Sequence, residues 1–332
     1  MLFDATPKMT KANTFIIGSR GSDLALWQAN YVRDTLRSLY PDLTVEIEII
    51  HTMGDRVLDT PLAILGGKGV FTKEVEEALL DRRVDIAVHS LKDLPTVNPP
   101  ELTIRAVPKR ANVEDVFMSK DTSVRLMDLP DEATIATGSL RRKAQILSKR
   151  PDLQIVDIRG NVPTRIQKML DSNWAGMILA RAGVERLGLT KYLAHTISTE
   201  WVLPAVGQGA LGIQCRTEDA GVIALLAPMN HPETLAAITA ERAFLAALGG
   251  GCQVPIGAHG TIVGDTLELT GCVAGLDGKS VIRGVHTGNA HSAARIGNDL
   301  AQSLLRDGAQ EILDAVFRIQ SAEEHVSSNP RG

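Results

Sequence analysis

Cationic and hydroxyl side chains recur in the loops that directly follow predicted strands. Arg20 and Ser22 come after the apolar segment TFIIG, and Ser90 and Lys92 come after DIAV. Arginine forks and the free N–H groups of a helix's first turn bind carboxylates or phosphates, and strand-end loops carry the ligand sites of open α/β sheets. The sequence therefore predicts a site for a ligand with several anionic groups, although each residue taken alone is also typical of a solvated surface charge. The candidates are Arg20, Ser22, Lys68, Ser90, Lys92, Thr137, Ser139, Arg141, Arg142, Arg159 and Arg165.

Asp93, in the segment HSLKDLP, is the candidate acid of this site. A carboxylate among cations stays ionised, and it can stabilise a developing cation or exchange a proton with a leaving amine. From the sequence alone, a helix cap or an ion pair with Lys92 explains the same residue equally well. Asp55, in TMGDR, is a weaker acidic candidate and is more typical of a turn.

Cys252 stands out among the three cysteines of the chain. Three glycines precede it and Pro255 follows it, which favours a structured loop, whereas Cys215 and Cys272 lie in strand patterns that predict core packing. A buried bystander role for Cys252 stays open, because thiol reactivity depends on exposure and pKa. The sequence contains no CxxC pair and no nearby histidine cluster, so we expect neither a disulfide framework nor a metal site.

Three other patterns carry less weight. The segment GQGALG at 207–212 matches GxGxxG, but a strand pattern follows it instead of a long helix, which argues against dinucleotide binding. The segment GGKGVF lacks the spacing of a phosphate-binding Walker loop. His51, His89 and His195 stand singly and are typical of core or surface histidines.

Strand and helix patterns alternate from Phe15 and predict two doubly wound α/β lobes, separated by a polar stretch near 109–133. The apolar segment 210–215 is expected to return the chain to the first lobe, so that two crossings make a hinged cleft. A helix, three strands with an Asp277-Gly278 hairpin, and two further helices then predict a small α+β domain. The expected domains are residues 14–108 plus 209–228 for lobe 1, 113–204 for lobe 2 and 232–320 for the third domain, with flexible ends at 1–13 and 321–332.

Bulk properties narrow the class of protein. The 332 residues suggest two or three domains, and a formal net charge of -4 argues against a general nucleic-acid binder. The sequence contains no run of eighteen apolar residues, which a membrane-spanning helix would require. The first residues do not resemble a secretory signal. We therefore expect a cytoplasmic protein that does not bind membranes.

Seven segments resemble the signature segments of the porphobilinogen deaminase family, in family order, over roughly residues 14–320. The resemblance implies two lobes like those of type II periplasmic binding proteins and a third domain with a three-stranded antiparallel sheet. It also implies a monomer. The segments are SRGSDLALWQ, GGKGVFTKE, DIAVHSLKDLP, SLRRKAQ, IRGNVPTR, LPAVGQGALGI and LGGGCQVPIGA.

The resemblance also implies a chemistry and assigns residues to it. Cys252 would hold a dipyrromethane cofactor through a thioether, and Asp93 would assist the loss of ammonia from porphobilinogen. Four porphobilinogen units would be joined head to tail and released as linear hydroxymethylbilane, a step of tetrapyrrole and haem biosynthesis. The basic and hydroxyl candidates would bind the carboxylates of cofactor and substrate, and Phe71 would lie over the cofactor. Two positions depart from the family pattern, Ile64 in place of a lysine and Gly138 in place of a serine.

Two other functions remain open from the sequence. A non-catalytic protein that closes two lobes on a small polyanion would carry no covalent group on Cys252. An unrelated thiol enzyme would use Cys252 as a nucleophile, and the sequence shows no obvious histidine partner for it.

Overall fold

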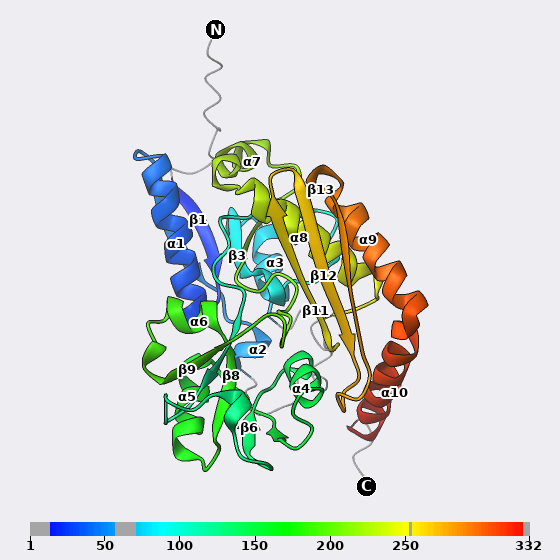
Figure 1. Ribbon diagram of the computed structural model, residues 1–332. Helices are drawn as coiled ribbons and strands as arrows, with labels where there is room; N and C mark the ends of the chain where they lie inside the picture. The colour runs from blue at the N-terminus through cyan, green and yellow to red at the C-terminus, as the bar shows by residue number, and fades with distance from the viewer. Residues whose placement is uncertain (1–13, 57–70, 252–253, 328–332) are drawn as a thin grey trace. The chain divides into compact units, whose positions relative to one another are not determined.

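The computed structural model describes residues 14–56, 71–251 and 254–327, which contain three β-sheets (Figure 1). The chain divides into two compact units. Of the described residues, one unit comprises 14–56, 71–110 and 210–235, and the other comprises 111–209, 236–251 and 254–327. The first unit contains the sheet of lobe 1, and the second contains the sheets of lobe 2 and of the third domain.

The sheet of lobe 1 has five strands in the order β2-β1-β3-β10-β4. Strands β1, β2 and β3 are parallel, whereas β10 runs antiparallel to both of its neighbours. The predicted return of the chain to this lobe is confirmed, because β10 pairs between β3 and β4. The expectation of parallel strands holds only for the first three. The strands are β1 (Thr14–Ser19), β2 (Thr44–Ile49), β3 (Ile86–Ser90), β4 (Leu102–Ala106) and β10 (Leu211–Arg216).

Helices cover both faces of this sheet, which is the doubly wound arrangement. Helix α1 starts after Ser22, whose hydroxyl accepts from the Ala25 N–H at 3.4 Å and caps the helix. Its buried side chains recur at helical spacing and pack on β1 and β3. A second core cluster, which includes Val75 and Leu79, packs α3 on the other face. The helices are α1 (Asp23–Leu39), α2 (Met53–Arg56), α3 (Lys73–Leu80) and α7 (Ala220–Leu226), with short turns at Leu91–Asp93 (η1) and Ala227–Met229 (η4).

The sheet of lobe 2 also has five strands, in the order β7-β6-β8-β5-β9. Strands β6, β7 and β8 are parallel, and β5 is antiparallel to β8 and β9. The strands are β5 (Asp115–Met118), β6 (Thr134–Ala136), β7 (Gln154–Val156), β8 (Gly176–Ala180) and β9 (Leu193–Ile197). The helices are α4 (Leu140–Leu147), α5 (Val162–Asp171) and α6 (Arg181–Arg186), with turns at Leu126–Asp128 (η2) and Thr190–Tyr192 (η3).

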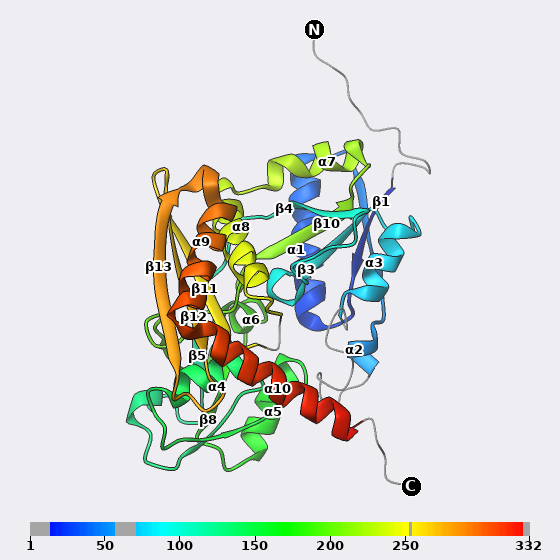
Figure 2. The same ribbon diagram turned by 90° about the vertical axis from the view of Figure 1, so that its right-hand side faces the viewer.

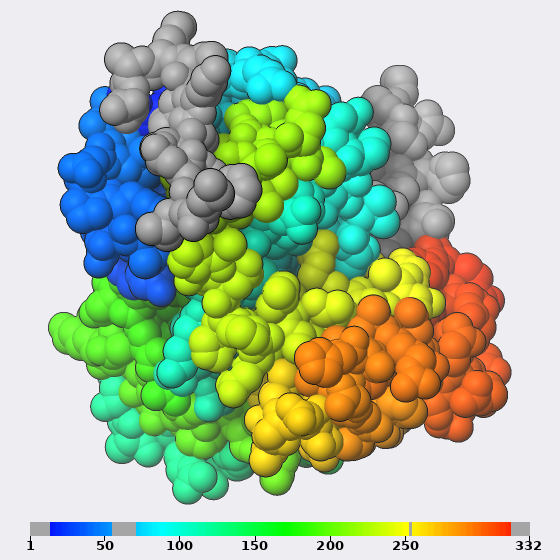
Figure 3. All heavy atoms as spheres, turned by 90° about the horizontal axis from the view of Figure 1, so that it is seen from above, coloured from blue at the N-terminus to red at the C-terminus, as the bar shows by residue number. Residues whose placement is uncertain are grey.

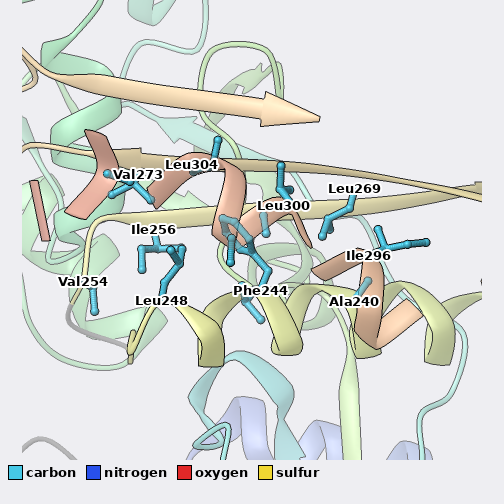
Figure 4. Close-up of a cluster of buried hydrophobic side chains, with 14 of the residues drawn as sticks. Ala240, Phe244, Leu248, Val254, Ile256, Leu269, Val273, Ile296, Leu300 and Leu304 are labelled. Atoms are coloured by element: carbon cyan, nitrogen blue, oxygen red, sulfur yellow. The ribbon is translucent and has the colours of Figure 1, made fainter. Parts of the chain in front are cut away.

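The third sheet is antiparallel, and helices pack against it to form the core of this part of the chain (Figure 2). Its core brings Phe244 of α8 against Leu300 and Ile296 of α9, over Leu269 of β12 (Figure 4). Atoms of α9 also lie at the surface (Figure 3, orange), in keeping with the exposure of Asn298. The elements are α8 (Pro232–Ala247), β11 (Ile256–Val263), β12 (Thr266–Ala274), β13 (Val281–Asn289), α9 (Ala293–Leu304), η6 (Leu305–Ala309) and α10 (Gln310–Ser327), with a turn at Ala290–Ser292 (η5).

Two local expectations differ from the structure. The stretch near 109–133 contains β5, a strand of only four residues that is fully buried, so it shows no alternation that the sequence could reveal. The tail expected from Ser321 is helical as far as Ser327, because its alanine and glutamate residues continue α10. The division into three domains stays a prediction, since the two compact units place lobe 2 and the third domain together.

Candidate active site

A small hollow of about 60 Å³ opens in lobe 1 at the ends of β1 and β3. Its polar lining combines one cation, one carboxylate and several neutral hydrogen-bonding groups. The lining residues are Arg20, Ser22, Leu24, Ala25, Gln28, Phe71, Thr72, Val88, His89, Ser90 and Asp93.

Contacts among these side chains position the polar groups. The Arg20 guanidinium lies over the Phe71 ring, 4.3 Å from the ring centroid, a cation–π contact that orients the cation. Gln28, on the sheet-facing side of α1, donates to the Ser90 hydroxyl at 2.7 Å. The two strand-end loops are therefore tied to each other through α1.

Asp93 ends the short turn η1 and is half-buried. Among the described residues, no hydrogen bond or ion pair to Lys92 or to any other side chain engages its carboxylate. Neither sequence-level alternative for Asp93, a helix cap or an ion pair with Lys92, is therefore seen in the part of the chain that the structure describes. Lys92 itself is half-buried and does not line the hollow.

A second set of predicted residues lies at the start of α4 in lobe 2. The Ser139 hydroxyl accepts from the Arg142 N–H at 3.5 Å and caps the helix, while the Thr137 hydroxyl accepts from the Ser139 N–H at 3.3 Å. Gly138 lies between them, and a Cβ there would be 2.6 Å from the Ile158 carbonyl oxygen. The departure from serine at this position therefore fits a backbone that passes too close for a side chain.

Arg141 and Arg142 are buried and pair with one carboxylate. The Asp115 carboxylate is 2.9 Å from Arg141 Nη1 and 2.7 Å from Arg142 Nη2, and it also accepts from Gln208 at 2.9 Å. Burial alone would raise the pKa of Asp115, but the two guanidinium groups outweigh it and hold this pKa well below its usual range. The two guanidinium groups are thus fixed in place, and the cluster retains a net positive charge for an anion.

Arg159 and Arg165 belong to the loop after β7 and the start of α5. Arg159 Nε is 3.2 Å from the Asp157 carboxylate, and Arg165 Nε donates to the Gly160 carbonyl at 2.7 Å. Gly160 has φ +115°, a conformation that glycine adopts freely. Asn161 then caps α5 by accepting from the Thr164 N–H at 2.9 Å.

The structure thus groups most of the predicted residues by lobe. Arg20, Ser22, Phe71, Ser90 and Asp93 share the hollow of lobe 1. The described candidates of lobe 2 lie in the loops after β6 and β7 and in the first turns of the helices that follow them, α4 and α5. Lys68, Cys252 and the departure Ile64 lie outside the described residues, as does the side chain of Asp55.

Comparisons with known proteins place the chain in a family. The family model for the "porphobilinogen deaminase, dipyromethane cofactor binding domain" matches residues 15–224, and that for the porphobilinogen deaminase C-terminal domain matches residues 235–306. The porphobilinogen deaminase of Geobacter metallireducens is 50% identical over 308 residues, which is 93% of this chain and 96% of the relative. That of Trichlorobacter lovleyi is 48% identical over 306 residues, 92% of this chain and 97% of the relative.

The chain belongs to the porphobilinogen deaminase family. Both sets of candidate residues lie within the matched cofactor-binding region of that family. Among solved structures, the periplasmic aliphatic sulphonate binding protein SsuA of Escherichia coli aligns with a TM-score of 0.37 at 11% identity, covering 71% of each chain. So distant a likeness adds nothing to the function that the family implies.

The sequence did not reveal every polar residue of this site, and Gln28, His89 and Asp115 show why. Gln28 had a usable signal, since it is a polar residue within the apolar stripe of α1. His89 was passed over as a single histidine, yet it lines the hollow. Asp115 gave no local signal, because its partners Arg141 and Arg142 meet it only through the fold. Among the described residues, no cluster of His, Cys, Asp and Glu could hold a metal ion.

Proposed function

We propose that this chain is a hydroxymethylbilane synthase, a transferase that joins four porphobilinogen molecules head to tail and releases linear hydroxymethylbilane for tetrapyrrole biosynthesis. The observation that carries the proposal is the Asp93 carboxylate, set beside Arg20 and Ser22 in the hollow of a porphobilinogen deaminase family member. No side chain in the described part of the chain engages this carboxylate. Porphobilinogen carries an acetate, a propionate and an aminomethyl group. Cations and hydroxyls recognise the first two, and a carboxylate recognises the third.

Asp93 is the proposed catalytic residue. Its carboxylate would hydrogen-bond the substrate's ammonium group, which leaves as neutral ammonia with the electron pair of the broken C–N bond. The carboxylate would then stabilise the cation that remains on the pyrrole. Arg20 and Ser22 would bind a substrate carboxylate within the same lobe. Because Phe71 packs against Arg20, the ring would also limit the positions that this cation adopts.

The residues present fit a dipyrromethane cofactor, a group with several carboxylates. Thr137, Ser139, Arg159 and Arg165 present hydroxyls, guanidinium groups and helix N-termini at strand ends, and Arg141 and Arg142 add a buried positive charge. We propose that these residues, with Lys68, Phe71, Ser90 and Lys92, bind cofactor and substrate. When bound, the cofactor supplies the free pyrrole carbon to which new units are joined.

Cys252 is the proposed attachment point, through a thioether. The other two cysteines are unsuited to it, because both are buried and burial raises the pKa of each thiol to about 11. A thiol that holds its proton at neutral pH is a poor nucleophile. The raised pKa values also disfavour a thiol enzyme that uses Cys215 or Cys272 as its nucleophile.

Several wider properties are part of the same proposal. We expect three domains, with a hinged cleft between lobes 1 and 2, and a cytoplasmic monomer that binds neither nucleic acid nor membranes. The described helices include none long and apolar enough to cross a membrane.

Asp93→Asn tests the proposed chemistry. The amide keeps the size of the side chain but has no negative charge to stabilise the cation, so we expect the rate of porphobilinogen consumption to fall about a hundredfold or more, with the bound cofactor retained. Asp81→Asn, at an exposed aspartate of the same lobe, is the matched control and should turn over normally. Asp93→Asn turnover within a few-fold of the wild type would refute the role of Asp93.

A further inference from the structure

A chain of hydrogen bonds runs from the hollow of lobe 1 into α3. His89 Nε2 is 3.0 Å from Gln214 Oε1, and Gln214 Nε2 donates to the Glu76 carboxylate at 2.9 Å. The three residues belong to β3, β10 and α3. His89 is 6% exposed and Gln214 is fully buried, so water does not compete with the bond that joins them.

The order of donors and acceptors along this chain determines which ring nitrogen of His89 carries the proton. An ionised carboxylate only accepts hydrogen bonds, so the Gln214 amide must present its NH₂ group to Glu76 and its carbonyl oxygen to His89. His89 must then carry its proton on Nε2, which leaves Nδ1 without one in the neutral ring. Burial, helped by the charge of Arg20 and opposed by the bond to Gln214, lowers the pKa of His89 to about 4.

A neutral His89 matters for the groups beside it. Arg20 faces the same hollow from the loop after β1, and Asp93 faces it from η1. An imidazolium here would repel Arg20 and would compete with an incoming ammonium group for the Asp93 carboxylate. The backbone next to His89 is held as well, because the Leu91 N–H donates to the Ala210 carbonyl at 3.1 Å and Gln28 donates to Ser90.

We propose that His89 is a positioning residue of the active site: the Glu76–Gln214–His89 chain holds the imidazole as its neutral Nε2–H form and thereby fixes the end of β3, from which Ser90 and Asp93 enter the hollow. The proposal rests on the proposed function of Asp93. Glu76 sets the orientation of the whole chain. Burial raises the pKa of Glu76. Acidification therefore neutralises the carboxylate whose charge fixes the donors and acceptors of the Glu76–Gln214–His89 chain.

Two substitutions of His89 test the position of the donor. Glutamine places an NH₂ group close to the position of Nε2, whereas asparagine is too short to reach Gln214. We expect His89→Gln to keep kcat within about threefold of the wild type and His89→Asn to lose about tenfold or more, because a buried partner is left unsatisfied. Both should keep KM and the bound cofactor. Equal kcat for the two variants would overturn the proposal.

Glu76→Gln tests the Glu76–Gln214–His89 chain and leaves the shape of the Glu76 side chain almost unchanged. The amide that replaces the carboxylate can donate or accept, so Gln214 is free to turn and His89 should populate the Nδ1–H form. NMR of histidine-labelled protein, with His89 assigned from His89→Gln, should show pure Nε2–H in the wild type and in the control Glu77→Gln, whose side chain is 55% exposed on the same helix. It should show a mixture of tautomers in Glu76→Gln.

Either of two NMR results would contradict the proposal: a wild-type His89 that titrates near pH 6.5, or one that carries its proton on Nδ1. The NMR measurement requires no turnover. Failure of the wild type to consume porphobilinogen would therefore remove the proposed function of Asp93 separately from the tautomer of His89. A Glu76→Gln variant whose His89 stays purely Nε2–H would remove the role of Glu76.

Discussion

Two guanidinium groups share the Asp115 carboxylate in the interior of lobe 2, where Asp115 is fully buried. Taking three charges out of water is costly, and their attraction compensates only while all three are present. Arg141 also donates to the Leu203 carbonyl at 2.7 Å and Arg142 to the Ile178 carbonyl at 3.1 Å. Together, Asp115 and the two arginines therefore hold α4 against β5, β8 and the loop that leads back to lobe 1.

Asp115→Asn should destabilise the protein by about 3–5 kcal/mol, because it leaves two buried cations without a carboxylate. The pKa of Asp115 is lower in the folded state than the roughly 3.9 of an unfolded chain. Its contribution is therefore complete above about pH 4 and is lost as the pH falls below that value. Urea unfolding at several pH values should show a steeper loss of stability below pH 4 in the wild type than in the variant.

The reference for this comparison is Asp157→Asn, at an exposed aspartate beside Arg159 in the same lobe, with a side chain 61% exposed. Exposed ion pairs contribute little, so that variant should unfold like the wild type. An Asp115→Asn variant as stable as Asp157→Asn would show that the buried cluster does not hold α4.

At the level of single residues, the sequence predicted groups whose role is local and missed groups whose role depends on distant partners. Ser22 and Ser139 were singled out because each closely follows a predicted strand, and in the structure each caps the next helix. Asp93 could be recognised through its segment. The hydrogen-bond chain of His89 could not be recognised from the sequence, since Gln214 and Glu76 come from two other elements.

At the level of elements, close packing of α8 against α9 depends on one glycine. A Cβ on Gly297 of α9 would lie 2.8 Å from the Phe244 nitrogen of α8 and would clash with the Ala240 carbonyl oxygen. Phe244 and Leu300 fill the space beside this crossing (Figure 4). The helix pair therefore has no room for even a methyl group.

Gly297→Ala should destabilise the third domain by about 1–3 kcal/mol, because the overpacking cost exceeds the gain in helix propensity of up to ~1 kcal/mol. Thermal unfolding followed by circular dichroism measures the effect. Asn298→Ala, on the exposed side of the same helix, should be neutral or slightly stabilising. A Gly297→Ala protein with an unchanged or higher Tm would mean that α8 and α9 are less closely packed than the structure indicates.

Long elements with a clear period could be predicted, and short buried strands could not. The first helix expected in the third domain is α8, and its three expected strands are β11, β12 and β13. Strand β5 was missed because four buried residues carry no alternation. The apolar pattern also could not predict the direction of β10, since parallel and antiparallel buried strands have the same apolar residues.

At the level of the whole molecule, family membership and the geometry of the site support the same proposed function. The two family models match residues 15–224 and 235–306, and the hollow of lobe 1 presents Asp93 with a cation and hydroxyls. Cys252, the residue on which the central proposal also depends, lies outside the described residues. Its covalent state is therefore the most informative property to measure.

Intact mass and peptide mapping of the purified protein, with an assay of porphobilinogen consumption on the same sample, test the central claim most directly. We expect two linked pyrrole units on the peptide that contains Cys252, and their absence in Cys252→Ser. The wild type should consume porphobilinogen and Cys252→Ser should not. Cys272→Ser is the matched control and should keep the modification. A wild-type protein that carries no pyrrole on Cys252 and also fails to consume porphobilinogen would contradict the proposed function.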